Sequence, residues 1–307
     1  MRDFTVPAEA GLRDAGLGAG TTIALPSGRI AYAERGAGPP VVFVHGLLVN
    51  ANLWRNVVPT VADAGFRCIA PDWPLGAHQV PMPAEADLTP YGVADLIAEF
   101  LDELDLTDVT VVANDTGGAL TQILMANHPQ RLGRVVLTPC DAFEAFFPEP
   151  YTPLPKLVRL PGASWLASRL LRLPVVRRRP WAFGWLAKHG IPGEILDSYL
   201  SPIHDSREIR RDARRFIAGV DKKYTLGAAE SLTGFRKPVL LVRAADDRIF
   251  PAQLFERLSA ILPDARLITV ADCWSFVPED QPGELARLIV DFATDRRADV
   301  VEEEHGC

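Results

Sequence analysis

Short apolar runs alternate with amphipathic stretches along most of the chain, and this rhythm predicts a layered fold of strands and helices. The runs are rich in apolar and β-branched residues, which is typical of strands buried on both faces of a parallel sheet. We expect such strands at residues 41–45, 67–70, 109–113, 134–137, 239–243 and 266–270. Because helical segments separate them, the sheet should be mostly parallel and covered on both faces.

Capping residues and apolar spacing predict the helices between these strands. Thr89 followed by Pro90 is typical of an N-cap and a first helical position. Other helices are expected over residues 51–62 and 116–127, from Gln253, and from Pro282. Ahead of the first buried strand, residues 21–25 and 29–33 flank a Pro-Ser-Gly turn, which predicts a hairpin.

The rhythm stops at Asp141. From there to about Ser231 the chain is rich in Pro, Arg, Trp and Phe, with helical fragments and no clear strand. We therefore expect residues 1–140 and 232–307 to form one α/β core and residues 141–231 to form an inserted helical cap.

The composition narrows the possible partners. The chain has 307 residues, of which 48% are hydrophobic and 23% charged, as in globular proteins. Its formal net charge of −7 argues against nucleic acid and against anionic membranes as partners. The basic run at 177–179 fits a solvated helix end. No apolar stretch reaches the roughly 18 residues of a membrane span, and the N-terminus lacks a signal-peptide pattern.

Cysteines and loop motifs give no sign of a bound group. The four cysteines form no CxxC pair and show no metal-ligand spacing, so we expect reduced thiols in a cytoplasmic protein. Neither a GxGxxG fingerprint nor a P-loop occurs, and we expect no cofactor and no metal. These features leave the oligomeric state open.

The segment that carries most chemical information is residues 111–120, Val-Val-Ala-Asn-Asp-Thr-Gly-Gly-Ala-Leu. A β-branched run breaks there into a small-x-Asp-x-Gly turn and then into a helix-forming stretch, which is the layout of a nucleophile elbow. Ala113 and Gly117 are the small residues that such a crowded turn requires. Asp115 occupies the nucleophile position. A carboxylate there attacks carbon to form an alkyl ester, which indicates opening of C–halogen or epoxide bonds.

Three motifs in this order resemble the α/β-hydrolase fold family, in its capped branch with an Asp nucleophile, whose best known members are haloalkane dehalogenases and epoxide hydrolases. They are His45-Gly46 after an apolar strand, Asn-Asp-Thr-Gly-Gly at 114–118, and the strand and turn at 239–251. The resemblance covers nearly the whole chain outside its first 20 and last 10 residues. It implies an α/β-hydrolase fold: a mostly parallel central sheet flanked by helices, with an inserted helical cap.

The resemblance also implies roles for particular residues. Asp115 would be the nucleophile, and Asp247 would be the acid that supports a catalytic histidine. The oxyanion-type hole and its loop would comprise His45, Gly46, Leu47 and Thr116, with the backbone N–H groups of Leu47 and Thr116 as donors. A small apolar molecule is the substrate that such a site implies.

The catalytic histidine itself is missing. The family usually places Gly-His before the Phe of the segment 272–282, and here Trp274-Ser275 stands in that place. Two positions differ rather than one, which favours natural loss over an engineered His→Ser trap. In Asp-nucleophile hydrolases the histidine activates the water that hydrolyses the alkyl ester. Loss of a general base typically costs about 10²–10⁴-fold in rate, so the ester should persist.

Further departures concern the substrate. Haloalkane dehalogenases typically place Trp and Asn, as halide donors, where this chain has Thr116 and Leu47. Epoxide hydrolases use two cap tyrosines on the epoxide oxygen, and the candidates here are Tyr151, Tyr199 and Tyr224. Each of these tyrosines has simple packing as its alternative role.

Two residues at the carboxyl edge of the predicted sheet could replace parts of the lost machinery. His78 lies in the loop that leaves the strand ending at Ala70, so it is either a substitute base or a loop brace. Asp141 follows the strand ending at Leu137, and it rivals Asp247 because some Asp-nucleophile hydrolases draw their acid from that position.

The leading hypothesis is a hydrolase of the haloalkane dehalogenase/epoxide hydrolase type, impaired or altered by the loss of its histidine. Two alternatives stay open: a degenerate member that binds a small ligand without turnover, and a non-hydrolytic lyase or isomerase in which Asp115 shuttles a proton. The Trp274-Ser275 pair discriminates among them, because hydrolysis requires a base near Asp115.

Overall fold

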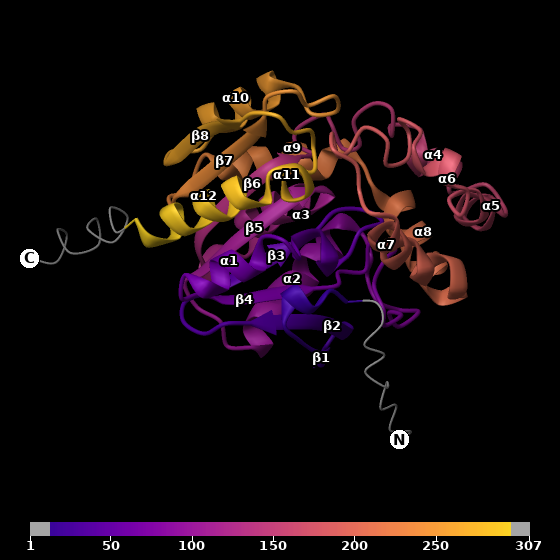
Figure 1. Cartoon of the computed structure of the whole chain (residues 1–307), viewed down its shortest axis with the longest axis horizontal. Helices are drawn as coiled ribbons and strands as arrows, with labels where there is room; N and C mark the ends of the chain where they lie inside the picture. The colour runs from indigo at the N-terminus through magenta and orange to yellow at the C-terminus, as the bar shows by residue number, and fades with distance from the viewer. Residues whose placement is uncertain (1–12, 296–307) are drawn as a thin grey trace, which may run out of the picture.

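A computed structural model describes residues 13–295 and places one eight-stranded sheet at the centre of the molecule (Figure 1). The spatial order is β1-β2-β4-β3-β5-β6-β7-β8. The strands are β1 (Ala19–Leu25), β2 (Gly28–Arg35), β3 (Pro40–Val44), β4 (Arg67–Pro71), β5 (Val109–Asp115), β6 (Leu132–Cys140), β7 (Val239–Ala244) and β8 (Ala265–Val270).

The strand directions confirm the mostly parallel sheet. β1 and β2 form the predicted hairpin, with Leu25 opposite Gly28, and β2 is antiparallel to β4. From β4 to β8 all pairings are parallel. The carboxyl ends of β3, β5, β6 and β7 therefore meet at one edge, which is where ligands bind in open α/β sheets. The fold is that of an α/β-hydrolase, as the motifs predicted.

Helices cover both faces of the sheet (Figure 1). One layer contains α1 (Val58–Asp63) and α12 (Pro282–Thr294), which contact each other. The other contains α2 (Pro90–Glu103), α3 (Thr116–Asn127), α9 (Lys222–Leu232) and α10 (Ala252–Ile261). Because α9 contacts α3, the end of the predicted cap segment packs with the core layer.

Capping and apolar periodicity explain the long core helix α2. The Thr89 hydroxyl accepts a hydrogen bond from the Gly92 N–H, and Pro90 is the first helical residue, as predicted. Its buried face includes Val93, Ile97 and Phe100. Fully burying one such side chain stabilises the fold by about 1.5–3 kcal/mol.

One predicted helix is divided in two. Residues 51–62 were expected to be continuous, but the structure has a 3₁₀ turn, η2 (Ala51–Trp54), and then the short helix α1. Pro59 lies in the first turn of α1 and has no N–H to donate to the carbonyl four residues earlier. The helix therefore restarts there instead of running through.

The chain between β6 and α9, where the sequence predicts the cap, is helical in the structure, and we call this segment the cap. It contains α4 (Leu154–Leu157), α5 (Ala163–Leu170), α6 (Pro174–Arg177), α7 (Gly193–Asp205) and α8 (Arg207–Gly219). α7 and α8 lie beside the core, and α4, α5 and α6 lie at the outer edge, with α5 outermost (Figure 1). Short turns η1 (Ala15–Leu17), η3 (Pro129–Arg131) and α11 (Val277–Asp280) complete the described chain. Within residues 13–295 no helix combines the length and apolar character needed to cross a bilayer.

Candidate active site

The junction of β5 and α3 forms the sharp turn that the sequence predicted. Asp115 has φ +55° and ψ −133°, a conformation that non-glycine residues rarely adopt and that stores strain. The turn also lies close to neighbouring strands. A Cβ on Gly117 would lie 2.4 Å from the Val44 carbonyl oxygen, and one on Gly118 would lie 2.2 Å from the Cys140 Cβ. Glycine at both positions allows α3 to start directly above the sheet.

Backbone donors hold the Asp115 carboxylate. The Leu47 N–H donates to Oδ2 at 3.1 Å, and the Thr116 N–H is a second donor. A Cβ on Gly46 would lie 2.1 Å from the same Oδ2, so the loop passes too close to the carboxylate for any side chain. Burial raises the pKa of Asp115 to about 6, although these two N–H groups lower it and the charge of Asp247 raises it. At neutral pH the group is mainly a carboxylate.

His45 fixes the loop that carries Leu47. Its Nε2 accepts from the Trp73 N–H at 2.8 Å, and its Nδ1 lies 2.9 Å from the Gly46 carbonyl oxygen. Burial lowers the pKa of His45 to about 4, so the ring is neutral. These contacts are those of the structural role that its motif suggested.

Ser275 and Asp247 lie together, but the pair contains no imidazole. The Ser275 Oγ donates to Asp247 Oδ1 at 2.7 Å, and the backbone N–H groups of Ile249 and Phe250 donate to the same oxygen. Asp247 Oδ2 is buried and has no hydrogen-bond partner in the described chain. Burial raises the pKa of Asp247. The resemblance implied that Asp247 supports a catalytic histidine. In the structure, Asp247 instead accepts a hydrogen bond from a serine hydroxyl.

Asn114 connects the elbow to this pair. Its Nδ2 donates to the Ser275 carbonyl oxygen at 2.8 Å and also to Thr138 Oγ1 at 2.8 Å. The motif by itself assigned no role to Asn114. Its place directly before Asp115 was the available signal, because a residue there lies at the same sheet edge.

The ring of Trp274 packs against the side chain of Arg248. The guanidinium of Arg248 lies 4.0 Å from its ring centroid, a cation–π contact. The Trp274 N–H donates to Asp280 Oδ2, and Asp280 also accepts from the backbone N–H groups of Lys188 and His189. Asp280, which the sequence did not single out, thus ties the altered loop to the cap.

Asp141 adds a third carboxyl group. It is fully buried, and its Oδ2 accepts from Thr116 Oγ1 at 3.1 Å. Its Oδ1 has no partner within the described residues. Burial, and then the charge of Asp115, raise the pKa of Asp141 well above its usual range. Two carboxyl groups that share a site seldom ionise together, so the charge of each disfavours ionisation of the other.

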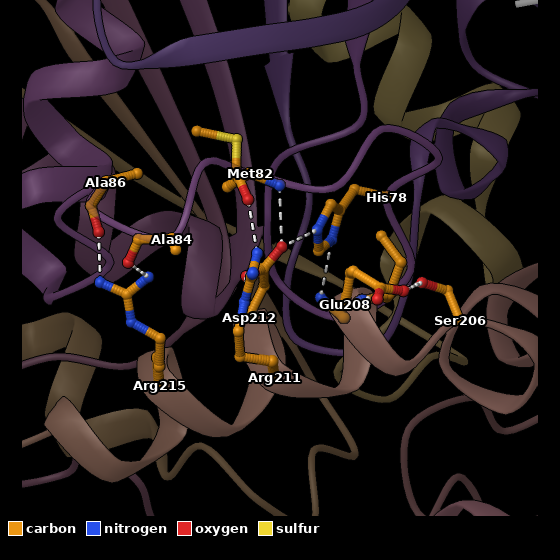
Figure 2. Close-up of polar contacts among 11 residues, drawn as sticks. His78, Met82, Ala84, Ala86, Ser206, Glu208, Arg211, Asp212 and Arg215 are labelled. Atoms are coloured by element: carbon orange, nitrogen blue, oxygen red, sulfur yellow. Dashed lines mark hydrogen bonds and ion pairs between the residues drawn. The ribbon is translucent and has the colours of Figure 1, made fainter.

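His78 faces the cap helix α8 (Figure 2). Its Nδ1 accepts from the Gly76 N–H at 3.3 Å, and its Nε2 lies 3.4 Å from Asp212 Oδ2. Asp212 also accepts from the Met82 N–H at 2.8 Å. Both ring nitrogens therefore have partners that join the loop after β4 to α8. These are the contacts expected of a brace.

The other histidines of residues 13–295 also have their contacts away from Asp115. His128 pairs with Asp95 at the surface, and His189 pairs with Asp272. His204 lies in α7, and both its ring nitrogens are buried without a partner in the described chain. His305 lies outside the described residues. No hydrogen bond in residues 13–295 joins an imidazole to Asp115.

The three cap tyrosines also have partners elsewhere. Tyr151 donates its hydroxyl to the carbonyl oxygens of Pro180 and Ala182. Tyr199 bonds Glu279, and the ring of Tyr224 packs edge-on against Tyr91. An epoxide oxygen would need two free tyrosine hydroxyls. Those of Tyr151 and Tyr199 are occupied by other partners, so these two residues do not supply the pair.

Comparisons with known proteins identify the family to which this fold belongs. A family model described as the alpha/beta hydrolase family matches residues 41–288. A cis-3-alkyl-4-alkyloxetan-2-one decarboxylase of Shewanella oneidensis is 28% identical over 87% of this chain and 86% of its own length. Haloalkane dehalogenase 2 of Mycobacterium tuberculosis is 26% identical over 86% and 91% of the two chains.

Solved structures show the same fold. A loop variant of the haloalkane dehalogenase DbeA from Bradyrhizobium elkanii superposes with a TM-score of 0.76 at 21% identity, covering 92% of this chain and 99% of its own. The family match extends from β3 to the last helix and so includes the elbow, the acid loop and the segment with Ser275. This chain belongs to the alpha/beta hydrolase family.

Proposed function

We propose that Asp115 is a nucleophile that captures a small apolar electrophile as an alkyl ester, and that this ester outlives the intermediates of ordinary Asp-nucleophile hydrolases. The observation that carries the proposal is the contrast between a held carboxylate at Asp115 and a serine bonded to Asp247. Relatives that are named haloalkane dehalogenases support a hydrolase of this family.

The first chemical step uses groups that are in place. One carboxylate oxygen of Asp115 forms a bond to a saturated carbon, and the bond from that carbon to its leaving group breaks with the electron pair on the leaving group. Oδ2, which accepts the Leu47 N–H, becomes the carbonyl oxygen of the ester. The two N–H groups at this carboxylate would then stabilise the oxyanion that forms when water attacks the ester.

The second step lacks its catalyst. Water must lose a proton as it attacks the ester carbonyl, and a serine hydroxyl is too weak a base to accept it. Ser275 already donates its own proton to Asp247. Hydrolysis of the ester is therefore slower by about 10²–10⁴-fold than with a positioned base. We propose that His78 is a brace and does not fill this gap, because both its ring nitrogens have other partners.

A second candidate function requires no base at all. One relative is named for decarboxylation of an oxetan-2-one, a strained β-lactone. Asp115 would attack the saturated ring carbon that bears the ring oxygen. The bond between this carbon and the ring oxygen would break, which releases a free carboxylate. Cleavage of the C–CO₂ bond would then supply the electron pair of an alkene while the ester C–O bond returns its pair to Asp115. The products are CO₂ and an alkene, and no proton moves.

The side chains near the nucleophile favour such a leaving group. Thr116 and Leu47 supply no side-chain donor of the kind that dehalogenases aim at a halide. The hydroxyls of Tyr151 and Tyr199 have other partners, so these two tyrosines would not protonate an epoxide oxygen. A carboxylate that leaves from a strained ring depends least on such donors.

The experiment is incubation of the full chain with bromoalkanes, epoxides, activated esters and a dialkyl oxetan-2-one, followed by intact mass spectrometry and product analysis. The proposal expects an adduct that maps to Asp115 with at least one alkyl electrophile. Alkene and CO₂ from the lactone without an accumulated adduct would favour the second candidate. Non-covalent retention of ligand, with neither adduct nor product, would instead support the small-ligand-binding alternative.

A further inference from the structure

Large exposed apolar side chains concentrate in one part of the cap. Among the described residues, every one except Tyr91 lies between positions 157 and 181. They are Leu157, Leu160, Trp165, Leu166, Leu170, Leu173, Val175 and Trp181, each at least 40% exposed. We call residues 156–181 the cap face. A gathering of apolar groups on this scale marks a binding surface rather than ordinary scatter.

Helix α5 has the reverse of the usual arrangement of its side chains. Its one buried residue is Ser168, whereas Trp165 and Leu166 are each 52% exposed. Leu170 follows Leu166 by one turn and extends the exposed apolar side. A helix of a water-facing surface would place these residues inward. α5 is also the outermost element of the cap (Figure 1); it contacts α7 and α8 and leaves Trp165 and Leu166 exposed.

The same segment is strongly basic. Residues 150–193 contain eight Lys or Arg and no Asp or Glu, in a chain whose net charge is −7. Arg172 and Arg177 pair with acids of α7, but Arg178 and Arg179 are exposed and make no ion pair within residues 13–295. The negative net charge of the whole chain predicts repulsion from anionic membranes. At this face the local charge is positive, so attraction to an anionic membrane is expected there.

We propose that the cap face docks on the surface of an anionic lipid bilayer. Exposed Trp and Leu among Arg is the composition of helices that lie in the membrane interface, where apolar side chains enter the acyl boundary and cations meet lipid headgroups. A second copy of this chain is a poorer occupant, because pairing two cap faces would oppose two basic surfaces. The acidic remainder of the chain would be repelled, which orients the cap toward the lipid.

The cap face is linked to the candidate active site. The Tyr151 hydroxyl donates to the carbonyl oxygens of Pro180 and Ala182, on either side of the exposed Trp181. Burial, and then the charges of Asp115 and Asp141, raise the pKa of Tyr151, so this tyrosine lies within the field of the two carboxyl groups. A docked cap would thus bring lipid-dissolved apolar molecules toward the site. The docking itself does not depend on Asp115 being a nucleophile.

The test is co-sedimentation of the full chain with vesicles of phosphatidylcholine alone or of phosphatidylcholine with phosphatidylglycerol. We expect binding only to the anionic vesicles, weaker at high salt. The paired substitutions Trp165→Ser with Trp181→Ser, and Arg178→Glu with Arg179→Glu, should each lower the partition coefficient by at least about tenfold. These side chains are exposed, so the fold should survive, as circular dichroism would verify.

A matched control is Arg236→Glu with Lys237→Glu, which changes the same charge on the core and should leave binding within about twofold. No binding to either vesicle, or binding that the cap variants do not change, would overturn the proposal. Self-association that the Trp variants abolish, without lipid binding, would assign the face to a second copy. Binding to soluble polyanions without binding to vesicles would also overturn the lipid proposal, because the face would then bind by charge attraction alone.

Discussion

The two ends of the candidate active site differ in how much of the family's machinery they keep. At the elbow, a strained Asp115, two backbone donors and closely packed glycines at 46, 117 and 118 are all present. At the other end, Asp247 is held by the backbone of its own turn, but its partner is the hydroxyl of Ser275. Under the proposed function, the first end would attack carbon, and the second end would no longer activate water.

The strained backbone of Asp115 is present although, among the described residues, no imidazole accompanies Asp247. The elbow conformation carries a free-energy cost of about 1–3 kcal/mol, which the surrounding contacts must offset. Those contacts include Asn114, which bonds the backbone of Ser275 rather than any side chain there. This contact with the loop therefore does not depend on the side chain at position 275.

The largest effect is expected from removing the Asp115 carboxylate, which lies at the end of the site that keeps its groups. Asp115→Asn should abolish covalent capture of every electrophile in the panel, because an amide is not a nucleophile toward alkyl carbon. The same change should raise the free energy of unfolding at neutral pH, because it removes a carboxylate that burial destabilises. Intact mass and urea unfolding measure the two effects. Undiminished adduct in this variant would move the nucleophile to another residue.

Restoring the altered end is the next test. Trp274→Gly with Ser275→His should speed decay of the alkyl ester by about 10²–10⁴-fold, because an imidazole beside Asp247 can accept the proton of water. Ser275→Ala is the matched control and should leave the decay within a few-fold of the original chain. If the double variant folds and its ester is no shorter-lived, the pocket has diverged beyond the base alone.

The pH dependence of ester formation tests Asp115 separately from the Ser275–Asp247 pair. Burial raises the pKa of Asp115 to about 6, and only the ionised form attacks. The rate of adduct formation should therefore rise about tenfold per pH unit below that value and level off above it. A raised carboxyl pKa also means that Asp115 favours folding most at low pH and that this contribution falls as pH rises through about 6. A rate flat from pH 5 to 8 would contradict this assignment.

The smallest effect on chemistry is expected at His78. His78→Ala should lower the free energy of unfolding by roughly 1–3 kcal/mol, because the loop after β4 loses its link to Asp212 and a buried ring is removed. Adduct formation per folded molecule should not change. Loss of ester hydrolysis with unchanged stability would instead identify His78 as the substitute base.

Local signals in the sequence were enough for the core. Helix α3 has the bounds that were expected, Thr116–Asn127, and the Thr89-Pro90 cap begins α2. The helix break at Pro59 was missed although its signal was present. These features depend on neighbours in the chain, which is why patterns reveal them.

Contacts between distant segments could not be predicted in this way. His78 lies 134 positions from Asp212, so its orientation toward the cap follows only from the folded chain. The outward orientation of Trp165 and Leu166 could not be predicted either, because their helical spacing would equally suit an inward face. In the candidate site, the motifs identified Asp115, Asp247 and Ser275, and the tertiary structure identified Asn114 and Asp280.

The most direct measurement is the lifetime of the ester on the unaltered chain. The protein would be loaded with a primary bromoalkane or whichever electrophile in the panel reacts, freed of excess reagent, and followed by intact mass alongside the Trp274→Gly, Ser275→His variant. The account predicts an adduct at Asp115 that persists at least about 10²-fold longer in the unaltered chain. Equal lifetimes, with released alcohol from the unaltered chain over many turnovers, would contradict it.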